Sequence, residues 1–108
     1  MIKATHQSLN QIIDQLKLYR PEKIILYGSL ARGEAANDID LLVIKKTKKN
    51  YFDRLREINQ RYLDRWRSGI PVDLTVYTPA EFALAKREKR VFIDQVEKYG
   101  QVVYQKTV

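Results

Sequence analysis

Three aspartates in this chain stand where carboxylates could take part in chemistry. Asp38 and Asp40 lie at the start of the apolar run IDLLVI, and Asp73 is the second residue of a later run, VDLTVYT. Side chains two positions apart on a strand share a face, and pairing of the two strands would bring the third acid beside the first two. Three such carboxylates would repel one another and raise each other's pKa unless a cation lay among them. Hard oxygen ligands of this kind suit Mg²⁺ or Mn²⁺.

A Gly-Ser pair precedes the acids and could bind the phosphates of a substrate. Gly28 permits a ligand to approach the backbone closely, and a helix N-capped by Ser29 would direct free amides and a hydroxyl outward. Two metal ions held ~3.5–4 Å apart stabilise both the attacking and the leaving oxygen of a phosphoryl displacement. Each residue taken alone is equally well explained as a turn, cap or edge residue. The combined order of strand, Gly-Ser, helix, Asp-x-Asp and strand is much harder to obtain by chance.

The elements that would position these residues alternate along the chain. Apolar periodicity predicts helices at Thr5–Tyr19 and Tyr51–Ser68, about two helical turns from Ser29, and helical structure from Pro79 to Tyr99 in one or two pieces. Short apolar or alternating runs predict strands at Lys23–Tyr27, Ile39–Ile44, Val72–Thr78 and 101–105. We therefore expect one α/β domain over residues 1–108, in which a small mixed β-sheet of about four strands is flanked by helices.

Two of these helices carry more detailed predictions. Thr78 is expected to N-cap the helix that Pro79 begins, with Glu81 completing a capping box. In the helix from Tyr51 to Ser68, the aromatic stripe is expected to face the core, and Arg54 is expected on the opposite, polar face.

Composition restricts the classes of protein to consider. The 20 basic residues against 13 acidic ones give a net charge of +7, which favours anionic partners such as nucleotides, RNA or an acidic protein surface. Taken alone, the basic runs Lys45–Lys49 and Lys86–Arg90 are better explained as solvated surfaces. The absence of cysteine excludes disulfides and thiolate metal sites. No apolar run approaches the ~18–20 residues of a membrane span and the first residues lack a signal-peptide pattern, so a cytoplasmic location is predicted.

The segment YGSLARGEAANDIDLLV, followed by VDLTVY, resembles the minimal nucleotidyltransferase family of the DNA polymerase beta superfamily. The resemblance spans Lys23 to Tyr77 and extends more weakly over the C-terminal region. It implies a palm-like nucleotidyltransferase fold, ATP as substrate and two Mg²⁺ ions.

By this resemblance, Gly28 and Ser29 would bind the phosphates of the nucleotide, and Asp38, Asp40 and Asp73 would form the catalytic metal site. Asp73 would also help to deprotonate the acceptor hydroxyl. Arg32 would steady the triphosphate, although a salt-bridged surface arginine explains it equally well.

The spacer between Ser29 and Asp38 departs from the family pattern. It consists of LARGEAAN, which is shorter than the usual spacer, and Asn37 stands where the family often has a serine just before the first aspartate. We interpret this difference as a trimmed turn.

The resemblance also suggests a biological role, since minimal nucleotidyltransferases are commonly paired with a small helical HEPN-type toxin. Some of these antitoxins transfer AMP from ATP to a tyrosine of the toxin. We expect no added domain that could recognise an acceptor, and we therefore expect the acceptor to be small or to be presented by a separate protein. The leading hypothesis is therefore AMP transfer to a hydroxyl of a HEPN-type partner.

Three alternatives are weighed against this hypothesis. They are nucleotidyl transfer to a small molecule, a catalytically weak or dead module that binds a nucleotide or a partner, and an RNA-binding domain. The intact Gly-Ser pair and three aspartates argue against a dead module, and the lack of an aromatic–basic RNA motif argues against direct nucleic-acid binding. The sequence leaves open whether the chain forms a homo- or hetero-oligomer.

Overall fold

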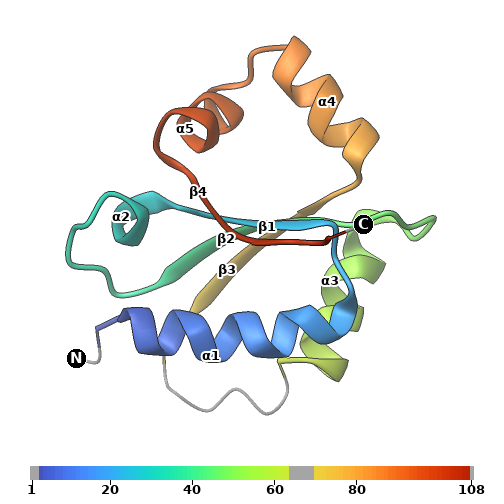
Figure 1. Ribbon diagram of the computed structural model, residues 1–108. Helices are drawn as coiled ribbons and strands as arrows, with labels where there is room; N and C mark the ends of the chain where they lie inside the picture. The colour runs from blue at the N-terminus through green and yellow to red at the C-terminus, as the bar shows by residue number, and fades with distance from the viewer. Residues whose placement is uncertain (1–2, 64–69, 108) are drawn as a thin grey trace.

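The structure, a computed structural model, describes residues 3–63 and 70–107, and its centre is a four-stranded mixed sheet (Figure 1). The strand order is β3-β2-β1-β4. β1 pairs antiparallel with both β2 and β4, whereas β2 pairs in parallel with β3. The strands are β1 Lys23–Tyr27, β2 Ile39–Ile44, β3 Val72–Tyr77 and β4 Gln101–Gln105. The predicted fold class, a small mixed sheet of about four strands flanked by helices, is confirmed.

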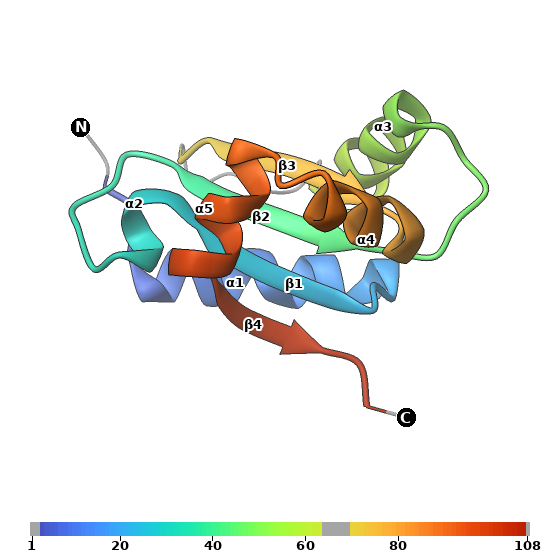
Figure 2. The ribbon, with the colours of Figure 1, turned by 90° about the horizontal axis from the view of Figure 1, so that it is seen from above.

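Helices cover both faces of the sheet (Figures 1 and 2). α1 and α3 lie against one face, α4 and α5 lie over the other, and the short α2 follows β1 at one end of the sheet. The helices are α1 His6–Leu16, the 3₁₀ turn η1 Lys17–Tyr19, α2 Gly28–Ala31, α3 Tyr51–Arg61, α4 Pro79–Arg87 and α5 Val91–Tyr99. Within the described ranges, no helix is long and apolar enough to cross a membrane.

The alternation of side chains along the strands divides the apolar residues between two clusters. Ile24 and Leu26 of β1 pack into the larger cluster with α1, whose Ile12 and Leu16 are fully buried. Ile25 belongs to the smaller cluster under α4 and α5. Because β1 and β2 are central and covered on both faces, almost every residue in them is apolar, which explains why both were readable as strands.

Several helix boundaries differ from the predictions. α1 ends at Leu16, and η1 carries the chain on to Pro21. α2 has four residues rather than two turns, and Gly33 follows it with φ +76. The prediction that Ser29 is an N-cap is wrong. Because Gly28 adopts φ +77 directly after the extended Tyr27, the helical turn begins one residue earlier, and Tyr27 occupies the N-cap position without a side-chain hydrogen bond.

The region from Pro79 to Tyr99 forms two helices, separated where Lys89 adopts φ 52. The predicted capping box at the start of α4 is confirmed: the Thr78 hydroxyl accepts from the Glu81 amide, and the Glu81 carboxylate accepts from the Thr78 amide. α3 ends at Arg61 with Tyr62 as its C-cap, and Leu63 lies in a bend, so the predicted helix is too long at these two residues. The rest of the prediction, to Ser68, falls on residues 64–69, which lie outside the described part of the chain.

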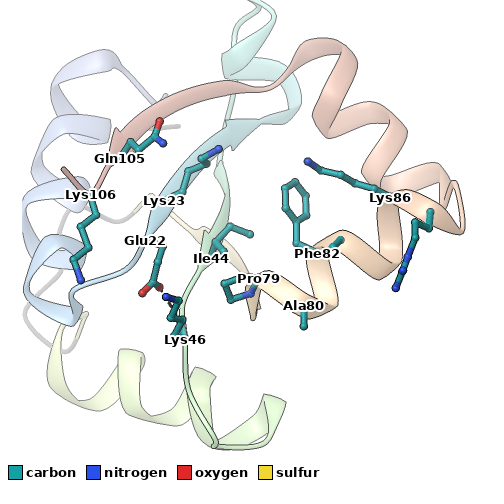
Figure 3. Close-up of a pocket in the computed structure, with 12 residues that line it drawn as sticks. Glu22, Lys23, Ile44, Lys46, Pro79, Ala80, Phe82, Lys86, Gln105 and Lys106 are labelled. Atoms are coloured by element: carbon teal, nitrogen blue, oxygen red, sulfur yellow. Dashed lines mark hydrogen bonds between the residues drawn. The ribbon is translucent and has the colours of Figure 1, made fainter. Parts of the chain in front are cut away.

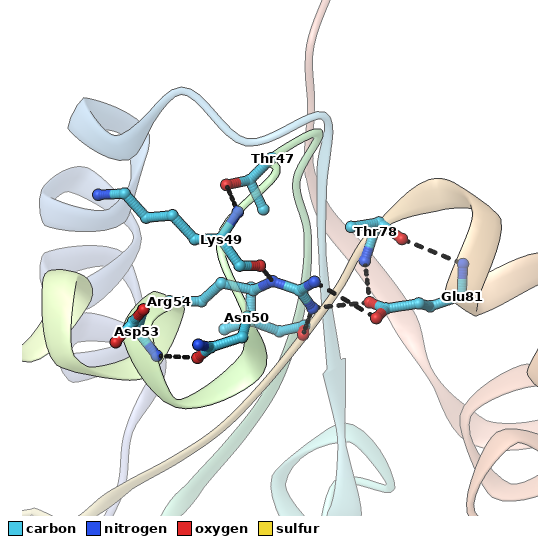
Figure 4. Close-up of polar contacts among 8 residues, drawn as sticks. Thr47, Lys49, Asn50, Asp53, Arg54, Thr78 and Glu81 are labelled. Carbon is cyan, nitrogen blue, oxygen red and sulfur yellow. Dashed lines mark hydrogen bonds and ion pairs between the residues drawn. The ribbon is translucent and has the colours of Figure 1, made fainter.

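Arg54 was expected on the polar face of α3, but its side chain is buried (Figure 4). Its Nη1 donates to Glu81 Oε1 at 2.7 Å and to the Val76 carbonyl at 3.1 Å, and its Nε donates to the Lys49 carbonyl at 2.8 Å. The guanidinium therefore joins α3, β3 and the start of α4. This position lies outside the apolar stripe, so periodicity alone assigns it to solvent.

Candidate active site

The sheet brings two of the three predicted acids side by side. Asp40 is the second residue of β2 and Asp73 the second of β3, and the parallel register pairs these residues directly. Paired residues of neighbouring strands point to the same face, so both carboxylates lie on the face that α4 and α5 cover. Asp38 lies in a bend just before β2 rather than in the strand. Asp38 and Asp73 are exposed, and Asp40 is partly buried.

Asp40 is the electrostatic centre of this group. Burial raises the pKa of its carboxyl to about 6, and the negative charges of Asp38 and Asp73 contribute further to the increase. Arg32 acts in the opposite direction and lowers the pKa. The acids are thus close enough to disfavour simultaneous ionisation, as expected for carboxylates that converge on one patch.

No group of three or more histidine, cysteine or acidic side chains among residues 3–63 and 70–107 is arranged to hold a metal ion as it stands. The chemistry of the donor set nevertheless fits a hard divalent cation. The donors would all be carboxylate oxygens. Burial raises the pKa of Asp40 most, and repulsion from Asp38 and Asp73 adds to the increase; a bound cation would relieve this repulsion.

Gly28 brings the backbone against the acids. With its φ of +77, a Cβ at this position would overlap Oδ2 of Asp40, so a side chain is excluded both by backbone conformation and by space. Gly33 has almost the same φ, +76, but a Cβ there would meet nothing within 4 Å. The glycine at position 28 is therefore required by close approach to Asp40, and the one at 33 only by the turn.

Ser29 and Arg32 lie on the same turn. Arg32 Nη2 donates to Ser29 Oγ at 3.4 Å, while its Nε donates to Glu34 Oε2 at 2.5 Å. Arg32 is therefore a salt-bridged surface arginine whose charge also lowers the pKa of Asp40. Its contact with a triphosphate stays a prediction.

Two further residues shape this end of the sheet and were not identified from the sequence. Tyr27 is the β1 partner of Asp40, and its ring packs edge-on against Phe92, with ring centroids 5.1 Å apart. Burial raises the pKa of Tyr27 to about 12, so its phenol stays protonated near neutral pH. Gln101 Nε2 donates to the Ala31 carbonyl at 2.7 Å and fastens α2 to β4. The position of Tyr27 directly before Gly28 was a usable signal, whereas the Gln101 contact depends on the tertiary fold.

A mixed sheet whose first two strands are joined by a Gly-Ser turn, with carboxylates paired at its edge, is an arrangement suited to phosphate chemistry. The chain matches the nucleotidyltransferase domain family over residues 8–103 and belongs to that family.

A solved structure supports the fold. The chain is similar to a crystal structure from Sulfolobus solfataricus, of a protein whose own assignment as a nucleotidyltransferase is provisional, with a TM-score of 0.57 and 21% sequence identity. The similarity covers 93% of this chain and 79% of that one. No functionally curated protein sequence matches this chain significantly.

Proposed function

We propose that this protein is a Mg²⁺-dependent nucleotidyltransferase that moves AMP from ATP to a tyrosine hydroxyl of a HEPN-type toxin and so acts as its antitoxin. Membership of the nucleotidyltransferase domain family establishes the general class of reaction. The observation that carries the proposal is the direct pairing of Asp40 with Asp73 beside the Gly28 turn. The antitoxin role and the toxin partner rest on the resemblance to minimal nucleotidyltransferases.

Each residue has a defined part in the proposed reaction. The Gly28 backbone, the Ser29 hydroxyl and Arg32 bind the phosphates, and Asp38, Asp40 and Asp73 would hold two Mg²⁺ ions. Bound Mg²⁺ would neutralise charge on the attacking and leaving oxygens. Asp73 accepts the proton of the acceptor hydroxyl. The hydroxyl oxygen then forms a bond to the α-phosphorus, and the bond from that phosphorus to pyrophosphate breaks.

The exposure of the acids supports a macromolecular acceptor. Asp38 and Asp73 are both solvent-exposed, so a hydroxyl on another protein can approach them. Arg32 would have to exchange its ion pair with Glu34 for the nucleotide phosphates, which an exposed pair permits at little cost.

The acceptor can be tested with a HEPN-type protein, the class of partner that the resemblance implies. After incubation of both proteins with ATP and Mg²⁺, mass spectrometry should show the partner heavier by one or more AMP units attached to tyrosine. Replacement of that tyrosine by phenylalanine should abolish the modification. An unmodified partner, together with AMP transfer to a small hydroxyl compound, would establish the small-molecule alternative instead.

A catalytically dead nucleotide-binding module is the second candidate. It is favoured by one observation, that the described acids are not arranged to hold a metal ion as they stand. Calorimetry separates the two candidates. The enzyme should bind ATP more tightly when Mg²⁺ is added, and this gain should vanish in Asp40→Asn, whereas a dead module should show no tightening with Mg²⁺.

A further inference from the structure

A groove of about 1070 Å³ opens on the α4 side of the sheet (Figure 3). It lies between α4 and the end of the sheet where β1 begins and β2 ends, so that Lys23 and Ile44 face Phe82 across it. Its volume is at the upper limit of pockets that enclose small ligands, which are about 300–1,000 Å³. Its size and open form are suited to a segment of a macromolecule.

The groove is separate from the acids. Asp40 lies near the start of β2 and Ile44 at its end, so that roughly 13 Å of strand separates them. Aromatic rings fill the intervening space: Phe92 packs against Tyr27 and against Tyr77, with ring centroids 5.1 Å and 6.4 Å apart. A ligand in the groove would therefore leave the proposed nucleotide site free.

The rim of the groove is strongly basic. Five cationic side chains line it: Lys23, Lys46, Lys86, Arg87 and Lys106. The acidic residue that lines it is Glu22, whose carboxylate already accepts a hydrogen bond from the Lys46 amide at 2.8 Å. The charge of this rim selects for an anionic ligand and against a second copy of this chain, which itself carries a net charge of +7.

The floor of the groove is apolar and distinguishes a protein ligand from a nucleic acid. Ile44, Pro79, Ala80 and Ala83 supply aliphatic surface. Phe82 is the aromatic residue of the lining, but Lys86 Nζ lies 4.3 Å from the centroid of its ring. Because a cation already covers one face of this ring, that face is not available for base stacking, on which binding of single-stranded nucleic acids depends. The aliphatic floor instead matches the apolar face of a helix laid into a groove.

We propose that this groove binds an amphipathic helix of a partner protein, with apolar residues against the floor and glutamates or aspartates against the basic rim. The helix docks at a distance from the acids, and its binding requires neither ATP nor Mg²⁺. Helix binding in the groove is therefore a separate property from the proposed transfer reaction, and each can be tested without the other.

Fluorescence anisotropy with synthetic helical peptides tests this inference in the full-length protein without nucleotide. The probe is a labelled peptide with leucines on one face and glutamates flanking them; a second peptide carries lysines in place of the glutamates. The Glu peptide should bind, and Lys86→Glu/Lys106→Glu should weaken its binding about tenfold or more. Ala83→Glu, which places a charge on the exposed apolar floor, should do the same. The control Lys3→Glu/Lys98→Glu makes the same charge change outside the groove and should leave binding within about twofold.

Three results would overturn the inference. The first is no binding of the Glu peptide to the wild-type protein, and the second is equal weakening by the groove variants and the control. The third is tighter binding of a single-stranded RNA oligonucleotide than of the peptide, with loss of RNA binding in the groove variants, which would reassign the groove to nucleic acid. Circular dichroism of each variant ensures that a loss of binding is not a loss of fold. A negative result for peptide binding would not contradict AMP transfer, because the transfer is measured separately through the mass of the partner.

Discussion

At the scale of single residues, Asp40 is the centre of the proposed active site. Its carboxylate lies beside the backbone of Gly28, is paired with Asp73 and is partly buried. The sequence identifies these residues because their types and order are unusual together. It does not reveal how close Asp40 comes to Gly28, since that depends on the positive φ of the glycine and on the register of β1 with β2.

The two left-handed glycines provide a matched pair of variants. Gly28→Ala and Gly33→Ala should each cost about 1 kcal/mol of stability from backbone strain. Only Gly28→Ala should also displace the Asp40 carboxylate, because only there would the Cβ overlap it. Urea unfolding and ATP-binding calorimetry should therefore show a larger stability loss and abolished nucleotide binding for Gly28→Ala alone. Equal effects of the two substitutions would contradict the assigned contact.

The raised pKa of Asp40 predicts a pH-dependent conflict between stability and function. A carboxyl whose folded pKa is raised from 3.8 to about 6 stabilises the fold below pH 3.8, and that contribution is lost as the pH rises through 6. Without divalent cations, Asp40→Asn should therefore stabilise the protein at pH 8 by about 1 kcal/mol, after allowance for solvent screening, and have little effect at pH 4. Urea unfolding of the wild type and the variant at pH 4 and at pH 8 measures this difference in stability. An equal change in stability at pH 4 and pH 8 would show that the charge of Asp40 does not cause the difference between the variant and the wild type.

At the scale of elements, the buried Arg54 holds α3 to β3 and α4. The sequence predicted the capping box of Thr78 and Glu81 correctly, because such boxes depend only on local spacing. It could not show that Glu81 also accepts from Arg54, 27 residues away in the sequence. The hydrogen bond to Arg54 lowers the pKa of Glu81, so the ion pair stabilises the fold above the ordinary carboxyl value of 4.5 and is lost as the pH falls through the lowered value.

Arg54→Ala should destabilise the protein by about 2 kcal/mol at pH 7, less than for a fully buried pair because Glu81 is partly exposed. The difference in stability between Arg54→Ala and the wild type should become smaller in acid, because Glu81 becomes protonated. Arg56→Ala is the control, since Arg56 forms an exposed ion pair with Asp53 and its removal should cost less than about 0.5 kcal/mol. Thermal unfolding of both variants provides the comparison. Similar losses of stability in the two variants would contradict a stabilising role for the hydrogen bonds of Arg54.

At the scale of the whole molecule, the sheet topology was only partly predictable. The central strands could be read from their apolar runs, and alternation of helices and strands indicated the fold class. The antiparallel pairing of β1 with β2 and the one-turn α2 could not be predicted, because they depend on the sharp turn at Gly28. The pairing of β1 with β4 could not be predicted either, because the two strands are far apart in the sequence. The three acids come from two separate segments, and only the parallel register of β2 with β3 makes Asp73 a neighbour of Asp40.

Binding of nucleotide and metal to this assembled site should stabilise the entire fold. With an ATP analogue that cannot be cleaved after the α-phosphate, present with Mg²⁺ at about 100 times its Kd, the free energy of unfolding should rise by about 2.7 kcal/mol. The increase should disappear with EDTA and in Asp38→Asn/Asp40→Asn. An unchanged increase in EDTA would contradict metal-dependent nucleotide binding.

The most direct test of the central claim, nucleotidyl transfer by these acids, follows the two ends of the triphosphate. ATP labelled in the α-phosphate or in the γ-phosphate is incubated with Mg²⁺, this protein and the proposed HEPN-type partner. We predict that only the α label reaches the partner, that pyrophosphate is released in equal amount, and that Asp38→Ala/Asp40→Ala transfers none. Transfer of the γ label, or full transfer of the α label by the double variant, would contradict it.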